Sequence, residues 1–298
     1  TRIPAEDLQP EEGGMVGRLN LSLYGTRDAA QNWAVEYTRT LRAAGLEPGK
    51  ASPCNFVHKT RDLALTVHGD DFTATGPIED LAWLEEMFRR RYDIKATVLG
   101  PDAHQAQEVI ILGRTLRWVQ GGIEYEADAR HHTIVIEELG LNDSATVSTP
   151  CGPEEQRVPT ESGEPLEAGE ATRYRALVAR LNYLALDRPD IQFGVKEAAK
   201  RMSAPCAPDW KLLKRIGRYL KLVPRAVQVF VWQNDPGELV TYVDSDWAGD
   251  RVSRKSTSGG MVFRGHHLIK AWSTSQQVIA LSSGEAELYA LTEGAAQT

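Results

Sequence analysis

Two pairs of acidic residues could bind a divalent cation, and the members of the first pair are adjacent. Asp70 and Asp71 lie between the apolar segments 63–67 and 72–75, a pattern that predicts two strands joined by a tight turn. Two carboxylates about 4 Å apart repel by roughly 4 kcal/mol at an effective dielectric constant of about 20, unless water or a cation screens them. Mg²⁺ suits such a pair, because it binds one or two carboxylates together with water and substrate phosphates. The alternative is that both are ordinary turn residues.

The second pair, Asp244 and Glu287, is separated by 43 positions. Asp244 interrupts an apolar strand, where a charge is costly unless it is paired or liganded. Glu287 falls on a predicted helix after two further strands, so both carboxylates could meet at one sheet edge and hold a metal ion. Spacing alone does not exclude their neighbours Asp246 and Glu285. The alternative is that all of these acids are simply solvated.

A basic segment stands out in a chain whose net charge is −7. Residues 196–225 carry nine Lys or Arg against two acids, although the overall acidity argues weakly against nucleic-acid binding. Lys and Arg are also good helix formers that solvate an outer face, so a purely structural role is the alternative. The candidate nucleic-acid-binding residues are Lys211, Lys214, Arg215, Arg218 and Lys221.

The elements that must position these residues follow from periodicity and from turn residues. Helices are predicted over 28–44, from 76–77 to about 88, and over 171–186, 189–202, 208–222 and 284–296, the last capped by Ser283. Strands are predicted over 55–58, 63–67, 72–75, 109–117, 122–126, 227–231, 239–243, 260–264 and 268–273. Residues 152–169, rich in Pro, Gly and Glu, are predicted to form a linker.

Composition limits the classes of protein to consider. The 298 residues suggest roughly two domains, and 42% hydrophobic with 25% charged residues is ordinary for a globular protein. The three cysteines have no zinc-site spacing, and their odd number favours a reducing compartment. No segment reaches the roughly 20 apolar residues of a membrane span, and the first residues do not resemble a secretion signal. We therefore expect an intracellular location, cytoplasmic or nuclear, and no membrane partner. The acidic, proline-containing start suggests that the chain was cut from something longer.

Several short segments follow one another along the chain. They are Leu-Ser-Leu-Tyr-Gly with the downstream Trp33, His68-Gly69-Asp70-Asp71, and the segments 147–150, 174–184, 188–191, 210–221, 242–250, 254–259 and 280–287. Together they resemble, in the same order, motifs of the reverse transcriptase and ribonuclease H of copia-type retrotransposon Pol polyproteins. The first resembles the family's SLYG motif, and His68-Gly69-Asp70-Asp71 falls where the family has YVDD.

The resemblance implies an α+β fold. Residues 1–145 would be the remainder of a reverse-transcriptase palm and a thumb-like region, 146–170 an acidic linker, 171–226 a helical basic connection, and 227–298 a truncated ribonuclease H-like mixed sheet with a helix. Asp70 and Asp71 would be polymerase carboxylates, and Asp244 and Glu287 the first two acids of the nuclease. Mg²⁺ or Mn²⁺ would be the cofactor, in a two-metal phosphoryl transfer. An RNA template, a DNA primer, an RNA–DNA hybrid, deoxynucleoside triphosphates and the rest of the polyprotein would be partners.

The sequence also departs from the family pattern. His68 and Gly69 replace Tyr and Val, and the further acids that each site of the family requires are not found, so we expect this chain to be inactive by itself. A second hypothesis is a decayed or repurposed element that binds nucleic acid or acts as a scaffold without catalysis. A third is a soluble α+β protein whose carboxylates only solvate turns.

Overall fold

The computed structural model describes residues 22–23, 25–152 and 163–298, and it confirms a mixed α+β protein with several antiparallel sheets. The chain divides into two compact units between Ala96 and Thr97. The domain boundaries that the resemblance implies, 1–145, 146–170, 171–226 and 227–298, stay a prediction. Positions 21 and 24 of the SLYG-like segment, and 153–162 of the expected linker, lie outside the described residues.

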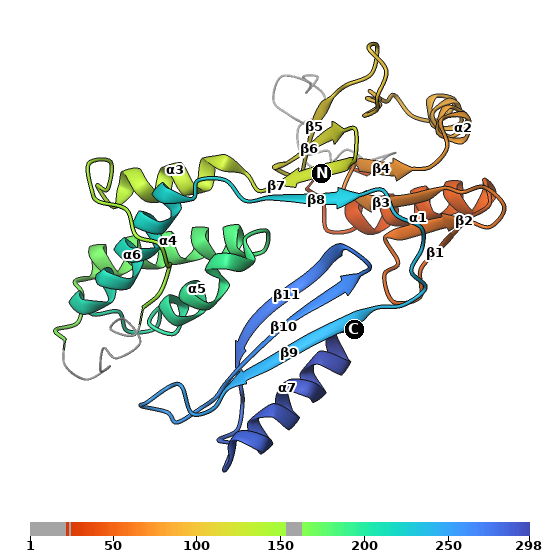
Figure 1. The fold of residues 1–298 in the computed structure, drawn as a ribbon. Coiled ribbons are helices and arrows are strands. Elements are labelled where there is room, and N and C mark those ends of the chain that lie inside the picture. Colours follow the sequence, from red (N-terminus) through yellow and green to blue (C-terminus); the bar gives the residue numbers. More distant parts are fainter. Residues whose placement is uncertain (1–21, 24, 153–162) are drawn as a thin grey trace, which may run out of the picture. The chain divides into compact units, whose positions relative to one another are not determined.

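In the first unit two helices accompany a four-stranded antiparallel sheet (Figure 1). The helices are α1 (Ala29–Ala43) and α2 (Ile78–Arg89), and the strands, in spatial order, are β1 (Leu46–Pro48), β2 (Asn55–His58), β3 (Ala64–His68) and β4 (Asp71–Thr75). Tyr37 and Leu41, one helical turn apart, pack with Phe56 and Leu65 of the sheet into one buried cluster. The apolar face of α1 therefore fixes it to the sheet that carries the first acidic pair.

The second unit contains another four-stranded antiparallel sheet, in the order β5 (Glu108–Ile111), β6 (Arg114–Val119), β7 (Gly122–Glu126) and β8 (Val227–Val231). The predicted single strand 109–117 is in fact two strands, since Leu112 (φ 50°) and Gly113 (φ 81°) form the turn between them. β8 pairs with β7 from Glu126↔Val227 onward. The strand expected to open the C-terminal domain thus completes the sheet of β5–β7.

Between β7 and β8 the chain forms a group of helices with its own core. These are α3 (Ala129–Glu138), α4 (Ala168–Ala185), α5 (Gln192–Ala199) and α6 (Trp210–Leu222), with short 3₁₀ turns at Pro189–Ile191 and Ala207–Asp209. Their buried residues form one cluster, including Val135, Tyr174, Leu177, Leu181, Val195, Leu213, Ile216 and Leu220. The sequence pattern did not predict α3, and α4 begins three residues before the predicted start at position 171.

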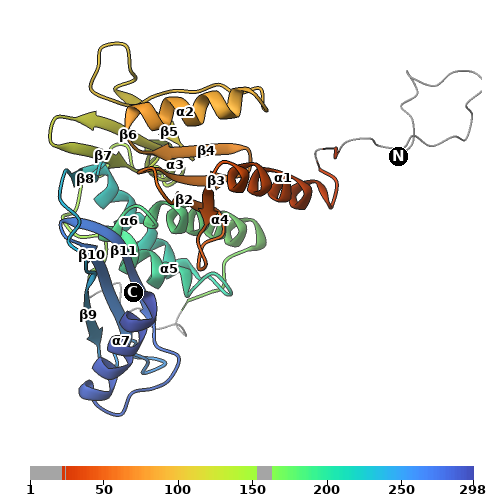
Figure 2. The same cartoon turned by 90° about the vertical axis from the view of Figure 1, so that its right-hand side faces the viewer.

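The C-terminal part is a three-stranded antiparallel sheet in the order β11 (His267–Ser275), β10 (Thr257–Arg264) and β9 (Val240–Asp246). α7 (Ser283–Gln297) packs on it through Ala286, Ala290 and Gly294 (Figures 1 and 2). Ser258 and Thr257 are neighbours whose side chains point to opposite faces. The side-chain amide of Gln276 donates to the hydroxyl of Ser258 and to the carbonyl of Ala286 on α7. The hydroxyl of Thr257 instead accepts a hydrogen bond from Lys196 of α5, so α5 and α7 lie on opposite faces of the sheet.

The helix cap differs from the expectation in one residue. The hydroxyl of Ser282, not of Ser283, accepts the hydrogen bond from the Glu285 backbone, and the Glu285 carboxylate accepts one from the Leu281 backbone. Within the described ranges, none of the helices combines the length and the apolar character needed to cross a bilayer.

Candidate functional site

Asp70 and Asp71 lie at the exposed tip of the β3–β4 hairpin, as the sequence predicted. His68 pairs with Asp71, which leaves Gly69 and Asp70 as the two turn residues. Gly69 has φ +64° while Asp70 is not in the left-handed region, the pattern of a type II′ turn. Phe72 packs on the core, so strand alternation directs Asp71 away from it. Both carboxylates are exposed on a turn that fixes their backbone.

A tryptophan of α1 holds this tip in place. Trp33 Nε1 donates a hydrogen bond of 2.7 Å to the carbonyl of Gly69, across 36 positions of sequence. Its ring lies 5.4–6.1 Å, edge to face, from the rings of Tyr37, Phe72 and Tyr92. The turn that carries the two acids is therefore anchored to the aromatic core of the first unit. Trp33 belongs to a motif of the sequence, but its positioning role was not predicted, since no local signal reveals a contact across 36 positions.

Glu287 contacts Ser245, the neighbour of Asp244 on β9, and the sequence did not predict this contact. Ser245 Oγ donates a hydrogen bond of 2.7 Å to Glu287 Oε1, and α7 covers the face of β9 on which Thr241, Val243 and Ser245 lie. Because successive residues of a strand point to opposite faces, Asp244 is directed to the other face. The structure brings the two elements together, and the meeting of the two carboxylates stays a prediction.

The two neighbouring acids have other partners. The Glu285 carboxylate accepts from the Leu281 backbone (2.7 Å) and from Tyr289 Oη (3.0 Å), so it caps α7. Asp246 pairs in register with Thr257, whose hydroxyl accepts a 2.6 Å hydrogen bond from Lys196 Nζ. Burial lowers the pKa of Lys196, while Glu197 and Asp246 oppose that shift. Asp246 therefore faces an internal ammonium group.

A fixed metal centre is not complete in the part of the chain that the structure describes. There, no group of three or more His, Cys, Asp or Glu side chains is placed to hold a metal ion. The Asp70–Asp71 turn offers two hard oxygen ligands to solvent, which fits a cation that completes its shell with water and phosphate. A shared ion at Asp244 and Glu287 stays a prediction.

The five basic candidates on α6 fall into two groups. Lys211 and Lys214 are exposed, and Arg218 is partly exposed with a buried Nε that has no hydrogen-bond partner among the described residues. In contrast, Lys221 Nζ donates to the carbonyls of Asn142 and Ser144. The guanidinium of Arg215 donates to the backbone carbonyl and to the hydroxyl oxygen of Thr149. Lys221 and Arg215 thus attach the segment that follows α3, and the structural alternative applies to them.

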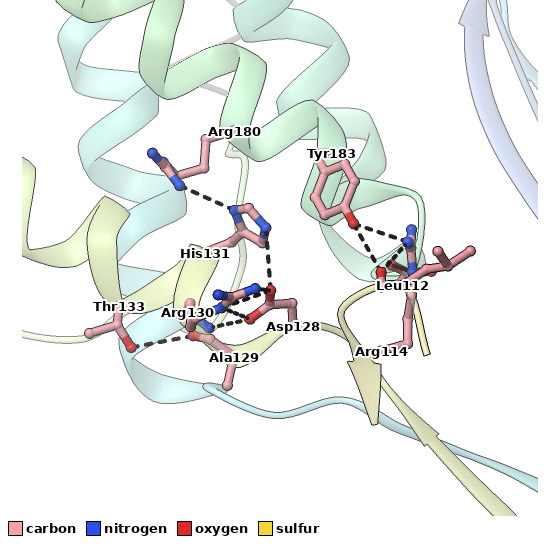
Figure 3. A network of polar contacts seen from close by, with 10 residues as sticks. Leu112, Arg114, Asp128, Ala129, Arg130, His131, Thr133, Arg180 and Tyr183 are labelled. Carbon is pink, nitrogen blue, oxygen red and sulfur yellow. Dashed lines mark hydrogen bonds and ion pairs between the residues drawn. The ribbon is translucent and has the colours of Figure 1, made fainter. Parts of the chain in front are cut away.

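Two other polar clusters are structural. Arg188 is 1% exposed and donates to Asp190 and to the carbonyl of Val223, which explains the Arg-Pro-Asp segment as a brace between helices. Figure 3 shows His131 of α3 between Asp128 and Arg180, with Arg180 donating to Nδ1 at 3.3 Å. Asp128 caps α3 by accepting from the Arg130 backbone at 2.9 Å.

Comparison with curated proteins finds relatives over most of the chain. It is 30% identical over 277 residues to the "Retrovirus-related Pol polyprotein from transposon RE2" of Arabidopsis thaliana, covering 91% of this chain and 18% of that protein. The corresponding RE1 polyprotein is 29% identical over 287 residues, 95% of this chain and 19% of that protein. The "Uncharacterized mitochondrial protein AtMg00810" of the same plant is 32% identical over 236 residues, 79% of this chain and 92% of that protein.

The chain thus spans about a fifth of the length of the curated polyproteins it matches. No family model matches the sequence, and no solved structure matches it.

Proposed function

Since this chain belongs to the family of retrovirus-related Pol polyproteins from copia-type transposons, we propose that it forms part of an RNA-directed DNA polymerase and ribonuclease H. The observation that carries the polymerase assignment is the exposed type II′ turn at Asp70 and Asp71, anchored by Trp33. Its substrates would be an RNA template, a DNA primer and deoxynucleoside triphosphates, with the remainder of the polyprotein as a partner.

Asp70 and Asp71 would hold Mg²⁺ or Mn²⁺. When bound, the ion would neutralise charge that develops on a phosphoryl group during in-line displacement. The role of the protein is positional, because the hairpin and the Trp33 hydrogen bond keep both carboxylates directed to solvent, where phosphate can complete the coordination shell.

Asp244 and Glu287 are assigned to the nuclease by their places in the motifs alone. Glu287 lies on α7 and accepts a hydrogen bond from Ser245, the neighbour of Asp244 on β9, and we derive no catalytic step from the two carboxylates. Because two acids per site are too few to hold two metal ions, we propose that these 298 residues bind nucleic acid but do not turn it over.

Mn²⁺ binding, measured by electron paramagnetic resonance, tests the first site independently of activity. We expect Asp70→Asn and Asp71→Asn each to weaken binding at least ten-fold. Asp62→Asn is the matched control, because Asp62 is exposed in a neighbouring turn of the same sheet, and it should leave binding unchanged. Equal binding by all four proteins would overturn the assignment.

Primer-extension and hybrid-cleavage assays with Mg²⁺ test the activity proposal. We expect a primer–template and an RNA–DNA hybrid to bind without extension or cleavage. Robust turnover would refute the proposed inactivity of the chain, and no binding of either substrate would refute the function itself.

One comparison favours the non-catalytic alternative. The matched region makes up 92% of AtMg00810, so a protein of nearly this extent occurs among the relatives. If the chain binds nucleic acid but neither acidic site binds Mn²⁺, a binding or scaffolding module is the better description.

A further inference from the structure

The loop between β9 and β10, residues 247–256, carries three cationic side chains that have no polar partner among the described residues. Across the described ranges, the side chains of Arg251, Arg254 and Lys255 form no hydrogen bond or ion pair, and both arginines are exposed. On α6, by contrast, Arg215 and Lys221 already bind protein carbonyls. The loop therefore offers a group of cations whose positions the internal contacts of the fold do not explain.

The acid within this loop is directed inward. Asp250 accepts hydrogen bonds from the backbones of Val252 (3.1 Å) and Ser253 (3.0 Å) and from Lys200 Nζ (3.1 Å) of the segment after α5. Burial raises the pKa of Asp250, but these hydrogen bonds outweigh it and lower the pKa to about 2. Its charge is thus compensated inside the protein, which leaves the outer side of the loop positive.

Further contacts fix the shape of the loop. Ser256, fully buried, accepts from the Ala248 backbone through Oγ (3.0 Å) and from the Gln276 backbone through its carbonyl (2.8 Å). Trp247 Nε1 donates to the carbonyl of Ala280 (3.1 Å), just before α7, while 46% of Trp247 remains exposed. Figure 1 shows the loop projecting from the end of the sheet at which α7 begins. The cations are therefore presented on a braced loop.

Arg254 is held in an unfavourable backbone conformation. Its φ is +59°, a region that favours glycine and costs other residues roughly 1–2 kcal/mol. A glycine would relieve this strain, yet an arginine occupies the position and its side chain gains no internal partner. Because no internal hydrogen bond or ion pair of the Arg254 side chain offsets this strain, the strain points to a role for the side chain in binding.

We propose that the loop 247–256 binds the phosphate backbone of an RNA–DNA hybrid, next to Asp244 at the end of β9. This inference rests on the proposed function. Guanidinium groups suit phosphate because their planar donors form paired hydrogen bonds with its oxygens. The nearest carboxylate on the strand, Asp246, lies close to the Lys196 ammonium, which reduces its repulsion of a phosphate.

The salt dependence of hybrid binding, measured by fluorescence anisotropy, tests this surface. The triple variant Arg251→Ala, Arg254→Gly, Lys255→Ala is compared with Arg42→Ala, Lys50→Ala, Lys59→Ala, which removes the same charge from the exposed surface of the first unit. We expect the slope of log K against log salt to become less steep by about three only in the loop variant, because each lost phosphate contact reduces it by about one.

Single substitutions at Arg254 separate binding from folding. Arg254→Gly should weaken binding roughly five-fold at about 0.15 M salt, the effect of one phosphate contact. It should leave the unfolding midpoint unchanged or higher, because glycine relieves the strain. Arg254→Lys keeps the charge and should recover most of the binding.

The outcomes distinguish this inference from the function on which it rests. A wild-type chain that binds the hybrid in a salt-dependent way, with equal slopes in the two triple variants, would overturn the inference and leave the function standing. A wild-type chain that does not bind the hybrid would overturn both.

Discussion

Arg225 donates two hydrogen bonds, of 2.6 and 2.8 Å, to the carboxylate of Glu126, which lies 99 positions earlier in the chain. Glu126 is the last residue of β7, and Arg225 lies two residues before the start of the strand β8 that pairs with it. Arg117 of β6 donates to the same carboxylate at 2.6 Å. The pair therefore closes the base of the helical group that is inserted between two adjacent strands.

Acid should weaken the interaction between Arg225 and Glu126. The hydrogen bond from Arg225, with that from Arg117, outweighs burial and lowers the pKa of Glu126 from 4.5 to about 2. Stability from this group is thus present above about pH 4.5 and is lost as the pH falls towards 2. The shift corresponds to about 3 kcal/mol, as an order of magnitude. Urea unfolding at pH 7 and pH 3 should show a smaller loss of stability in Glu126→Gln than in the wild type, whereas Glu86→Gln, at an exposed ion pair, should match the wild type.

The cations of α6 should separate by role. Lys221→Ala leaves the carbonyls of Asn142 and Ser144 without their donor, and we expect a loss of about 1–3 kcal/mol in the free energy of unfolding. Lys214→Ala, on the exposed face, should change stability by less than about 0.5 kcal/mol. Equal effects of the two substitutions on chemical denaturation would show that Lys221 has no bracing role.

Restoring the residue that the family has at position 69 should destabilise the hairpin. Gly69 occupies φ +64°, where valine is strained by roughly 1–2 kcal/mol. We expect Gly69→Val to lower the thermal midpoint, while Gly121→Ala, a substitution with open space around it and no left-handed backbone, should change it much less. An unchanged midpoint for Gly69→Val would contradict the II′ turn.

His131 should make the helical group sensitive to mild acid. Burial lowers its pKa below 6.5, and the cations Arg180, Arg130 and Arg114 add to this, while Asp128 opposes it. Because the folded state disfavours the proton, stability should fall as the pH drops below about 6.5. His131→Phe keeps the ring packing on Tyr183 and should reduce the slope of stability between pH 7 and pH 5. His266→Phe, at an exposed site, should keep the wild-type slope.

The local features were predictable and the long-range ones were not. The turn at Asp70 and Asp71 follows from Gly-Asp between two apolar runs, so sequence and structure agree there. The pairing of β8 with β7 joins segments that a hundred residues separate, and no local pattern encodes it. Leu112 shows the same limit at short range, because a leucine at φ 50° hides the turn between β5 and β6.

The acidic and basic candidates show the same division. The composition predicted a charged helix. Which of its cations bind protein carbonyls depends on residues 142–149, and these come close to the helix only when the chain folds. Similarly, spacing along the chain does not distinguish Glu285 from Glu287. Their partners do, because Glu285 caps the start of α7 beside Ser282, whereas Glu287 accepts a hydrogen bond from Ser245.

The insertion of the helices between β7 and β8 has a consequence during synthesis. A ribosome adding about 5–20 residues per second needs roughly 5–20 s to make the hundred residues between these strands. Throughout that interval the nascent sheet keeps an unpaired margin at β7, to which chaperones or neighbouring nascent chains have access. The yield of native protein should therefore depend on translation speed across this stretch more than on events within either strand.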